Sequence, residues 1–345
     1  MNNTIDCNAS ILDALRFLDE LSEGVQSLTL FVIDDTHTLC GTLTDGDIRR
    51  YLLSGGSVGN NVSEAMQKKY ISVRENDNNT VLMLRKCKIA GVTLVPCLNE
   101  YGQIIDVYDL KNYQSYLPID AILMAGGKGE RLRPFTEKKP KPLLEVGNKA
   151  IIDYNIDRLI SYGVKHISVT VNYLHEQIEK HFSKEREGIQ VACIREPQYL
   201  GTIGSVNFVD TFFNDTVLVM NSDLFTNINY EDFYFHFKEC GADMSVAAVP
   251  YTVSVPYGIF KLNGRYIEGI QEKPTYNYYA NAGIYLIKRE LLNRIPKDTF
   301  FNATDFMETL IHENLKVIRF PITGYWIDIG KPEEYIKAQE LVKYL

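Results

Sequence analysis

Residues 125–142, AGGKGERLRPFTEKKPKP, combine side chains that suit a polyphosphate. Three of the first five residues are glycines, which allow backbone N–H groups to come close to phosphate oxygens. Five basic residues follow within eleven positions: Arg131, Arg133, Lys138, Lys139 and Lys141. The whole chain has a net charge of −8, so this positive charge is local. We expect a confined anion site, and no broad basic surface for nucleic acid or an anionic membrane.

Two familiar phosphate motifs do not fit this stretch. A dinucleotide-binding GxGxxG would need a glycine at position 132, where Leu132 stands. A P-loop would need Ser or Thr directly after Lys128, where Gly129 stands. The anion site therefore belongs to another class.

The residues match the pattern G-G-x-G-x-R-L-x-P-x-T-x-x-x-P-K-P, which resembles the signature of sugar-1-phosphate nucleotidylyltransferases, also called NDP-sugar pyrophosphorylases. The matching residues are Gly126, Gly127, Gly129, Arg131, Leu132, Pro134, Thr136, Pro140, Lys141 and Pro142. The alternative is a solvated basic loop, which would rarely match so many positions. The resemblance implies that Ala125 and the three glycines bind the nucleotide.

In that family the oxygen of a sugar 1-phosphate attacks the α-phosphorus of a nucleoside triphosphate, and pyrophosphate leaves. Positioning and charge neutralisation do most of the work in such a transfer. The resemblance makes Arg131 a bidentate partner of the leaving pyrophosphate and Lys141 a compact charge at the reacting phosphates. Pro140 and Pro142 would stiffen the backbone on both sides of Lys141.

Two carboxylates are candidate ligands of Mg²⁺, the hard cation that polyphosphate chemistry requires. Asp223 ends the apolar run TVLVMNSD, where the family has a magnesium-binding aspartate after a glycine, and here Ser222 replaces that glycine. YWIDIGKPEEY resembles the family's W-x-D-x-G-x-P-x-x-Y and supplies Asp328. The alternative for a lone strand-end aspartate is a turn or cap. Glycosyltransferases are the nearest confusable class, but Asn221-Ser222-Asp223 is not their Asp-x-Asp motif.

REPQYLGTIGS resembles the family segment that recognises the base, with Glu196 at the recognition position and Gly201 in the following turn. A carboxylate can accept both adjacent donors of guanine, N1–H and the 2-amino group, whereas uracil and thymine offer one donor. We therefore favour GTP. UTP, dTTP and CTP remain open, because a glutamate before a proline can be a solvated loop residue.

For the sugar phosphate, IQEKP matches the family's E-K-P and implies that Glu272 bonds sugar hydroxyls and Lys273 neutralises the phosphate. Gly258 in a Tyr-Gly pair and Asn281 in Asn-Ala-Gly resemble elements that line the sugar pocket. The simpler interpretation of the intervening region is a β-hairpin, with Asn263-Gly264 as its turn.

Residues 118–345 contain the strands and helices that position the residues described above. Expected strands at 121–127, 166–173, 189–194 and 216–223 alternate with expected helices at 151–163 and 175–182. This alternation predicts an α/β fold with a doubly wound, mostly parallel sheet. The family resemblance implies that this sheet is Rossmann-like and similar to the GT-A fold. Ligands of such a sheet gather at the carboxyl ends of the strands.

Residues 1–117 contain two similar segments, at about 5–60 and 61–117, each with a helix, two strands and an acidic helix start. In the second segment the order is 80–91, 92–108 and 109–113. This small α/β unit resembles a tandem CBS pair, and the resemblance implies that Thr44 and Asp47 hold the ribose of a regulatory nucleotide. The second copy has no equivalent pair. A purely structural or dimer-forming unit is the alternative.

Six scattered cysteines form no CxxC pair or Cys/His cluster, which favours reduced thiols. The N-terminus lacks the features of a signal peptide, and no apolar run is long enough for a membrane span, so we expect a cytoplasmic protein. We separately expect a homo-oligomer.

Together these features predict a magnesium-dependent guanylyltransferase that makes a GDP-hexose from GTP and a hexose 1-phosphate. The arrangement of a CBS-like pair ahead of a transferase resembles guanylyltransferases of bacterial surface-sugar pathways. These include enzymes that act on glucosamine 1-phosphate on the way to legionaminic acid. Glucosamine 1-phosphate and mannose 1-phosphate are therefore the two favoured substrates. A rival of another class is a catalytically silent nucleotide sensor.

Overall fold

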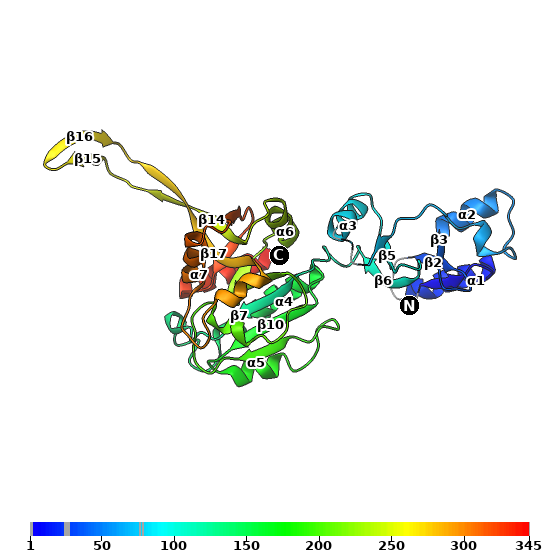
Figure 1. Cartoon of the computed structure of the whole chain (residues 1–345), viewed down its shortest axis with the longest axis horizontal. Coiled ribbons are helices and arrows are strands. Elements are labelled where there is room, and N and C mark those ends of the chain that lie inside the picture. The colour runs from blue at the N-terminus through cyan, green and yellow to red at the C-terminus, as the bar shows by residue number, and fades with distance from the viewer. Residues whose placement is uncertain (1–2, 24–27, 76, 78, 345) are drawn as a thin grey trace. The chain divides into compact units, whose positions relative to one another are not determined.

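A computed structural model describes residues 3–23, 28–75, 77 and 79–344, which fall into two compact units, Met1–Tyr116 and Leu117–Leu345 (Figure 1). Each unit has its own apolar core, so each is described by itself. Among the described residues no helix combines the length and apolarity needed to cross a membrane.

The first unit contains two sheets of three strands with the same topology. In each sheet the first strand runs parallel to the second, and the third runs antiparallel to it. The first sheet comprises β1 (Thr4–Asp6), β2 (Thr29–Ile33) and β3 (Leu39–Thr44), with α1 (Ile11–Glu23) and α2 (Asp45–Leu53); the second comprises β4 (Val73–Arg74), β5 (Leu94–Leu98) and β6 (Ile104–Asp109), with α3 (Thr80–Ile89). The internal repeat of the sequence is therefore also a structural repeat.

The two halves differ from expectation in two places. Val62 and Ala65 pack into the core of the first half, which therefore extends past residue 60. The expected helix start at residues 109–113 is wrong, because a turn follows β6. There the carboxylate of Asp109 accepts from the backbone N–H groups of Lys111 and Asn112, and this turn replaces the first turn of a helix.

The second unit is built on a sheet of seven strands in the order β11-β10-β7-β12-β17-β14-β18. Six strands point the same way and only β17 runs against them, which confirms the expected mostly parallel α/β sheet. The strands are β7 (Asp120–Met124), β10 (His166–Val171), β11 (Ala192–Arg195), β12 (Thr216–Asn221), β14 (Met244–Ser254), β17 (Thr275–Lys288) and β18 (Val317–Pro321). β7 and β12 are almost wholly buried, as expected for strands covered on both faces.

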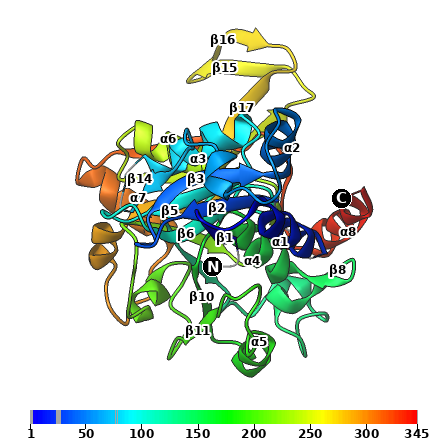
Figure 2. The same ribbon diagram turned by 90° about the vertical axis from the view of Figure 1, so that its right-hand side faces the viewer.

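Helices cover both faces of this sheet. On one face Phe306 and Leu310 of α7 pack with Val217 and Val219 of β12. On the other, Tyr230 at the start of α6 contacts Met220. The helices are α4 (Ile151–Ser161), α5 (His175–His181), α6 (Tyr230–Glu239), α7 (Ala303–His312) and α8 (Pro332–Leu341). The α8 helix lies beside the short strand β8 (Glu145–Val146), which pairs with β9 (Lys149–Ala150) (Figure 2).

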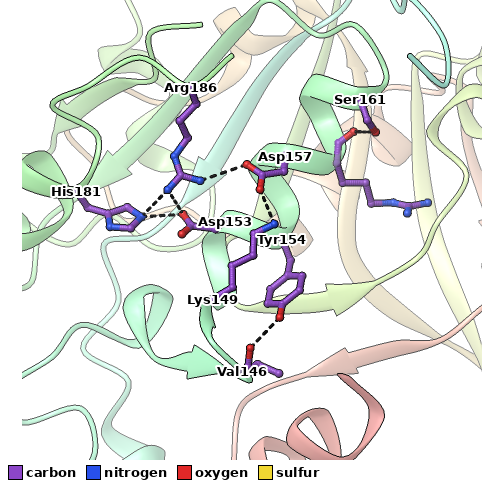
Figure 3. Close-up of polar contacts among 9 residues, drawn as sticks. Val146, Lys149, Asp153, Tyr154, Asp157, Ser161, His181 and Arg186 are labelled. Atoms are coloured by element: carbon purple, nitrogen blue, oxygen red, sulfur yellow. Dashed lines mark hydrogen bonds and ion pairs between the residues drawn. The ribbon is translucent and has the colours of Figure 1, made fainter. Parts of the chain in front are cut away.

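A charged network joins α4 to α5 and to the loop that follows α5 (Figure 3). Asp153, buried on α4, accepts from His181 at 2.7 Å and from Arg186 at 2.9 Å. Arg186 also contacts Asp157, one turn further along α4, at 3.2 Å, and Lys149 pairs with the same Asp157. These contacts fix α4, the helix that begins directly after β9.

β14 and β17 continue beyond the sheet as a two-stranded ribbon (Figure 1). The ribbon leads into a hairpin of β15 (Ile259–Asn263) and β16 (Tyr266–Gln271). We call residues 250–279 the arm. Its outer hairpin turns at Gly264-Arg265, one residue beyond the predicted pair Asn263-Gly264, because Asn263 still pairs with Tyr266. Gly264 has φ +59°.

Candidate functional site

The predicted nucleotide, catalytic and metal residues come together around one cavity of about 630 Å³. It opens at the carboxyl ends of β7 and β12, where parallel sheets hold their ligands. Its walls include Ala125, Gly126, Gly127, Gly129, Arg131, Lys141, Glu196, Gly201, Asp223 and Asp328. These residues come from four separate parts of the chain.

The glycine-rich loop follows β7, and two of its glycines are required by their surroundings. A Cβ on Gly126 would lie 1.8 Å from Oε1 of Glu196, so only glycine allows the carboxylate to approach. Gly129 has φ +64°, and Thr136 donates to its carbonyl at 2.8 Å, which folds the loop back on itself. Around Gly127, by contrast, there is open space within 4 Å, which leaves its backbone accessible to a ligand.

Lys141 is buried at the start of a short 3₁₀ helix, Lys141–Leu143. Pro140 before it is extended, with ψ 143°, and Pro142 after it occupies the first turn. The ammonium group of Lys141 contacts Oδ2 of Asp223 and lies 3.8 Å from Oδ1 of Asp328. One buried cation therefore sits between the two predicted metal ligands.

A short two-stranded ribbon brings the two aspartates together. β13 (Leu224–Thr226) pairs antiparallel with β19 (Trp326–Asp328), and the register places Leu224 opposite Asp328. Asp223 precedes this pair directly. Asn155 of α4 donates to the carbonyl of Leu224 at 2.8 Å and so ties the ribbon to the helix. The two carboxylates are thus held by backbone pairing rather than by loose loops.

The electrostatics of the aspartates fit a bound cation. Burial raises the pKa of Asp328 above its ordinary value, the nearby Asp223 carboxylate raises it further, and Lys141 offsets part of the effect. Oδ1 of Asp223 is buried and has no hydrogen-bond partner among the described residues. Such an orphaned carboxylate oxygen is costly unless a ligand satisfies it. Carboxylate oxygens are also the donors that Mg²⁺ prefers.

No group of three or more His, Cys, Asp or Glu side chains with metal-ligand geometry occurs in the described part of the chain. Mg²⁺ commonly binds through one or two carboxylates, with substrate phosphates and water supplying the other ligands. Asp223 and Asp328 satisfy that requirement, so the residues present fit a metal that arrives with the triphosphate.

Glu196 is 3% exposed and lies in the wall of the cavity against Gly126. Burial raises the pKa of this carboxyl to about 7, and the backbone N–H of Leu200, which donates to Oε2 at 3.1 Å, lowers it in part. A solvated loop residue, the alternative considered for Glu196, would be exposed. A buried ionisable group in a cavity wall is a candidate for contact with a ligand.

Gly201 has φ +83°, and a Cβ there would lie 2.6 Å from the carbonyl oxygen of Phe301. The same turn presents Tyr199 and Thr202 to the cavity. Sequence reasoning did not single out these two residues, although both lie inside the quoted segment REPQYLGTIGS.

Ser222, noted as a departure from the family pattern, is buried and donates to the carbonyl of Met124 at 2.7 Å. It therefore joins the ends of β12 and β7 beneath the cavity. Asn221 also lines the cavity, and a Cβ on Gly283 would lie 2.6 Å from its amide nitrogen. The sequence indicates neither the strand-joining hydrogen bond of Ser222 nor the place of Asn221 in the cavity wall, except that both residues are neighbours of Asp223.

The predicted sugar-phosphate residues do not line this cavity. Gly258, Glu272 and Lys273 lie on the arm, where Glu272 Oε2 would be 3.0 Å from a Cβ on Gly258. Asn281 lies at the root of the arm and bonds within its own strand, to Tyr285 and to the N–H of Gly283. The long regular pairing of β14 with β17 holds the first three residues out from the sheet.

In the first unit Thr44 and Asp47 form a capping box at the start of α2. Asp47 is buried, and its carboxylate accepts from Thr44, Arg50 and Gln67. These contacts lower the pKa of Asp47 even though burial raises it. The structure thus gives the pair a local structural role, and ribose binding stays a prediction.

Comparisons with known proteins agree with this site. Residues 120–344 match the family described as Nucleotidyl transferase. The chain belongs to this family. Mannose-1-phosphate guanylyltransferase catalytic subunit beta of Dictyostelium discoideum is 28% identical over 230 residues, which cover 64% of this chain and 64% of that protein. The chain thus spans slightly less than two thirds of the length of the curated relatives it matches.

Solved structures support the same fold. HddC from Yersinia pseudotuberculosis is 25% identical, with a TM-score of 0.52 over 65% of this chain and 99% of that one. UDP-glucose pyrophosphorylase from Acinetobacter baumanii is 17% identical, with a TM-score of 0.51 over 65% of this chain and 92% of that one. At 17% identity the second likeness concerns the fold alone.

Proposed function

We propose that the chain transfers a guanylyl group from GTP to a hexose 1-phosphate, giving a GDP-hexose and pyrophosphate. The observation that carries this proposal is the convergence of the glycine loop, Lys141, Asp223 and Asp328 on one cavity. The related protein of Dictyostelium discoideum is named a mannose-1-phosphate guanylyltransferase, which favours mannose 1-phosphate as the acceptor. Glucosamine 1-phosphate, and with it a role in making legionaminic acid, is the alternative acceptor.

In the proposed reaction an oxygen of the sugar phosphate forms a bond to the α-phosphorus of GTP. The bond from that phosphorus to the bridging oxygen breaks, and pyrophosphate leaves with the electron pair. The backbone of Gly127 and Gly129 cradles the phosphates, and Lys141 neutralises negative charge at the reacting centre. Arg131, next to Gly330 at the same mouth, neutralises the leaving pyrophosphate.

Asp223 and Asp328 would hold Mg²⁺, which neutralises the triphosphate and polarises its phosphorus–oxygen bonds. The contact between Lys141 and Asp223 has a second consequence, because the carboxylate holds the ammonium group in place before substrate arrives. The two aspartates and the basic loop would therefore bind the same magnesium–triphosphate complex.

Glu196 supports guanine as the base. Its carboxylate sits in the cavity wall beside the loop that follows β7. An ionised carboxylate accepts two parallel hydrogen bonds from guanine N1–H and the 2-amino group, and the loss of one such buried pair discriminates strongly between bases. A uracil or thymine base offers only one such donor and would make one hydrogen bond fewer to the carboxylate.

Glu272 and Lys273 remain the proposed partners of the sugar phosphate, although they lie on the arm. If Lys273 neutralises that phosphate, Lys273→Ala raises the KM for the sugar 1-phosphate by about tenfold or more and leaves the KM for GTP unchanged. Lys261→Ala, a change of another exposed arm lysine, is the matched control. Equal effects of the two substitutions on the KM for the sugar 1-phosphate would show that Lys273 does not bind the phosphate.

The proposed function is tested by pyrophosphate release from a matrix of triphosphates and sugar 1-phosphates with Mg²⁺. We expect release with GTP and one hexose 1-phosphate, and a loss of at least about a hundredfold in Asp223→Asn. Release with no pair in the matrix would favour the nucleotide-sensor alternative. Equal release by Asp223→Asn and the wild type would exclude the cavity as the site of reaction.

A further inference from the structure

The hydroxyl of Tyr173 contacts the middle of the basic loop, residues 125–142. Its oxygen lies 3.1 Å from the carbonyl oxygen of Thr136 and 3.1 Å from that of Glu137, so one hydroxyl hydrogen is shared between two consecutive carbonyl groups. Thr136 in turn donates from its side chain to the carbonyl of Gly129 at 2.8 Å. One tyrosine therefore fixes the turn that returns the loop to its glycines.

Gln177 holds the next residue of the loop. Its side-chain amide donates to the carbonyl of Lys138 at 2.9 Å. Together Tyr173 and Gln177 bind three consecutive backbone carbonyl groups, at positions 136–138. We call these two side chains the clasp. Neither residue belongs to the motifs from which the sequence predicts the site.

The clasp lies on the framework of the second unit. Tyr173 follows the end of β10, and its backbone N–H donates to the carbonyl of Gly126 at 3.4 Å. Gln177 lies on α5, whose Ile178 is wholly buried. His181 at the end of α5 joins the charged network with α4 (Figure 3). The basic loop is therefore held by a packed strand end and a packed helix.

Between the two residues of the clasp the chain makes an unusual turn. Leu174 has φ +50°, a left-handed conformation that residues with a side chain seldom adopt. This turn leads from the end of β10 into α5, so that Tyr173 and Gln177 both face the loop. Such conformations persist where the surrounding structure holds them, and they gather at functional sites. The conformation of Leu174 therefore favours a functional role for the clasp.

The residues that the clasp holds lie between two parts of the cavity wall. Gly129 and Arg131 precede positions 136–138, Lys141 follows them, and all three residues line the cavity. A shift of the held segment would therefore move groups that the proposed function places against phosphates. A misplacement of about 1 Å at a distance from the chemistry can cost about a hundredfold in rate.

We propose that Tyr173 and Gln177 are positioning residues, which hold the basic loop in the conformation that binds the triphosphate and the pyrophosphate. The effect on phosphate affinity rests on the proposed function, whereas the holding of the loop does not. The clasp contacts the loop and leaves the side chain of Glu196 untouched. It therefore sets the affinity for phosphates and does not change the preference among bases.

The first test measures the holding of the loop in the full chain and needs no enzyme activity. Four basic residues lie between positions 132 and 142, and three of them precede proline, so Lys138–Lys139 is the one bond there that trypsin cleaves readily. Under native conditions the cleavage rate follows the population of the opened segment. We expect this bond to be cleaved about fivefold faster in Tyr173→Phe and in Gln177→Ala, because each substitution removes a hydrogen bond.

Tyr154→Phe is the matched control for the cleavage test. The hydroxyl of Tyr154 also donates to a backbone carbonyl, that of Val146 at 2.8 Å, in the same unit but outside the loop (Figure 3). We expect this variant to leave cleavage at Lys138–Lys139 unchanged. Equal acceleration in Tyr154→Phe and Tyr173→Phe would mean a general loosening of the unit and would overturn the proposal. Unchanged cleavage in both Tyr173→Phe and Gln177→Ala would overturn it too.

The second test measures the binding of pyrophosphate with Mg²⁺ by calorimetry. The double variant Tyr173→Phe/Gln177→Ala should bind pyrophosphate about tenfold more weakly than the wild type and should have a higher KM for GTP. The ratio of kcat/KM for GTP to that for UTP should stay the same. Faster cleavage with unchanged pyrophosphate binding, or a changed ratio between the bases, would contradict the positioning role. A wild type without turnover would refute the proposed function, and the cleavage test would still decide whether the clasp holds the loop.

Discussion

In the proposed function, the buried side chain of Glu196 couples recognition of the base to its own protonation. Its carboxylate is enclosed by the cavity wall, so the free protein keeps it protonated up to about pH 7. A folded-state pKa above the unfolded value contributes stability at low pH, and that stability is lost as the pH rises through about 7. Under the proposal, guanine binds the ionised form of Glu196, whose charge is satisfied by the two donors of the base.

We therefore expect kcat/KM for GTP to fall about tenfold for each pH unit below 7. Glu196→Gln should abolish this fall and should lower kcat/KM for GTP at pH 8, because the amide nitrogen faces a donor of the base. The ratio of wild-type to variant kcat/KM, measured from pH 5.5 to 8.5, cancels the titration of the triphosphate itself. A ratio independent of pH would show that Glu196 does not read the base.

At the scale of elements, the helix α4 depends on its charged network. Burial raises the pKa of Asp153, but the hydrogen bond and charge of His181 and the contact with Arg186 outweigh that effect and hold the pKa below its usual range. A depressed folded-state pKa contributes stability above the unfolded value, near 4, which is lost as the pH falls below it.

Asp153→Asn should lower the free energy of unfolding at pH 7 by about 1–3 kcal/mol, because it leaves the side chains of Arg186 and His181 with a weaker hydrogen-bond partner. The matched control is Asp157→Asn, whose side chain is 38% exposed and which should cost less than about 1 kcal/mol. Chemical denaturation at pH 7 and pH 3 measures both. If the cost of Asp153→Asn stays the same at pH 3, the network is not the cause.

At the scale of the molecule, each unit has a separate core, the first around Leu30 and Ile48 and the second around Val219 and Phe306. The cavity belongs to the second unit alone. A ligand that binds one folded unit stabilises only that unit.

Calorimetric scans of the full chain should therefore contain two transitions. GTP with Mg²⁺ at about a hundred times its Kd should stabilise one of them by about 2.7 kcal/mol and leave the other in place. The same ligand should move neither transition in Asp223→Asn. A single transition that shifts as a whole would contradict the independence of the units.

The sequence predicted most of the cavity because its residues lie in short contiguous motifs after strands. Ten site residues in such motifs line one cavity. The pairing of β13 with β19, which joins Asp223 to Asp328, joins segments far apart in the chain and leaves no local pattern. The arm was not foreseen either, because alternation along a strand does not reveal whether the strand leaves its sheet. The helix expected at residues 109–113 failed because Asp109 favours a local turn.

The most direct test of the central claim is a competition among triphosphates. The protein is incubated with Mg²⁺, mannose 1-phosphate and glucosamine 1-phosphate, and equal concentrations of GTP, UTP, dTTP and CTP, and the nucleotide sugars are quantified by mass spectrometry. Product ratios under competition equal the ratios of kcat/KM. We predict that GDP-hexose exceeds every other product by about a hundredfold. A dominant UDP-, dTDP- or CDP-hexose would contradict the assignment of Glu196 as the reader of guanine.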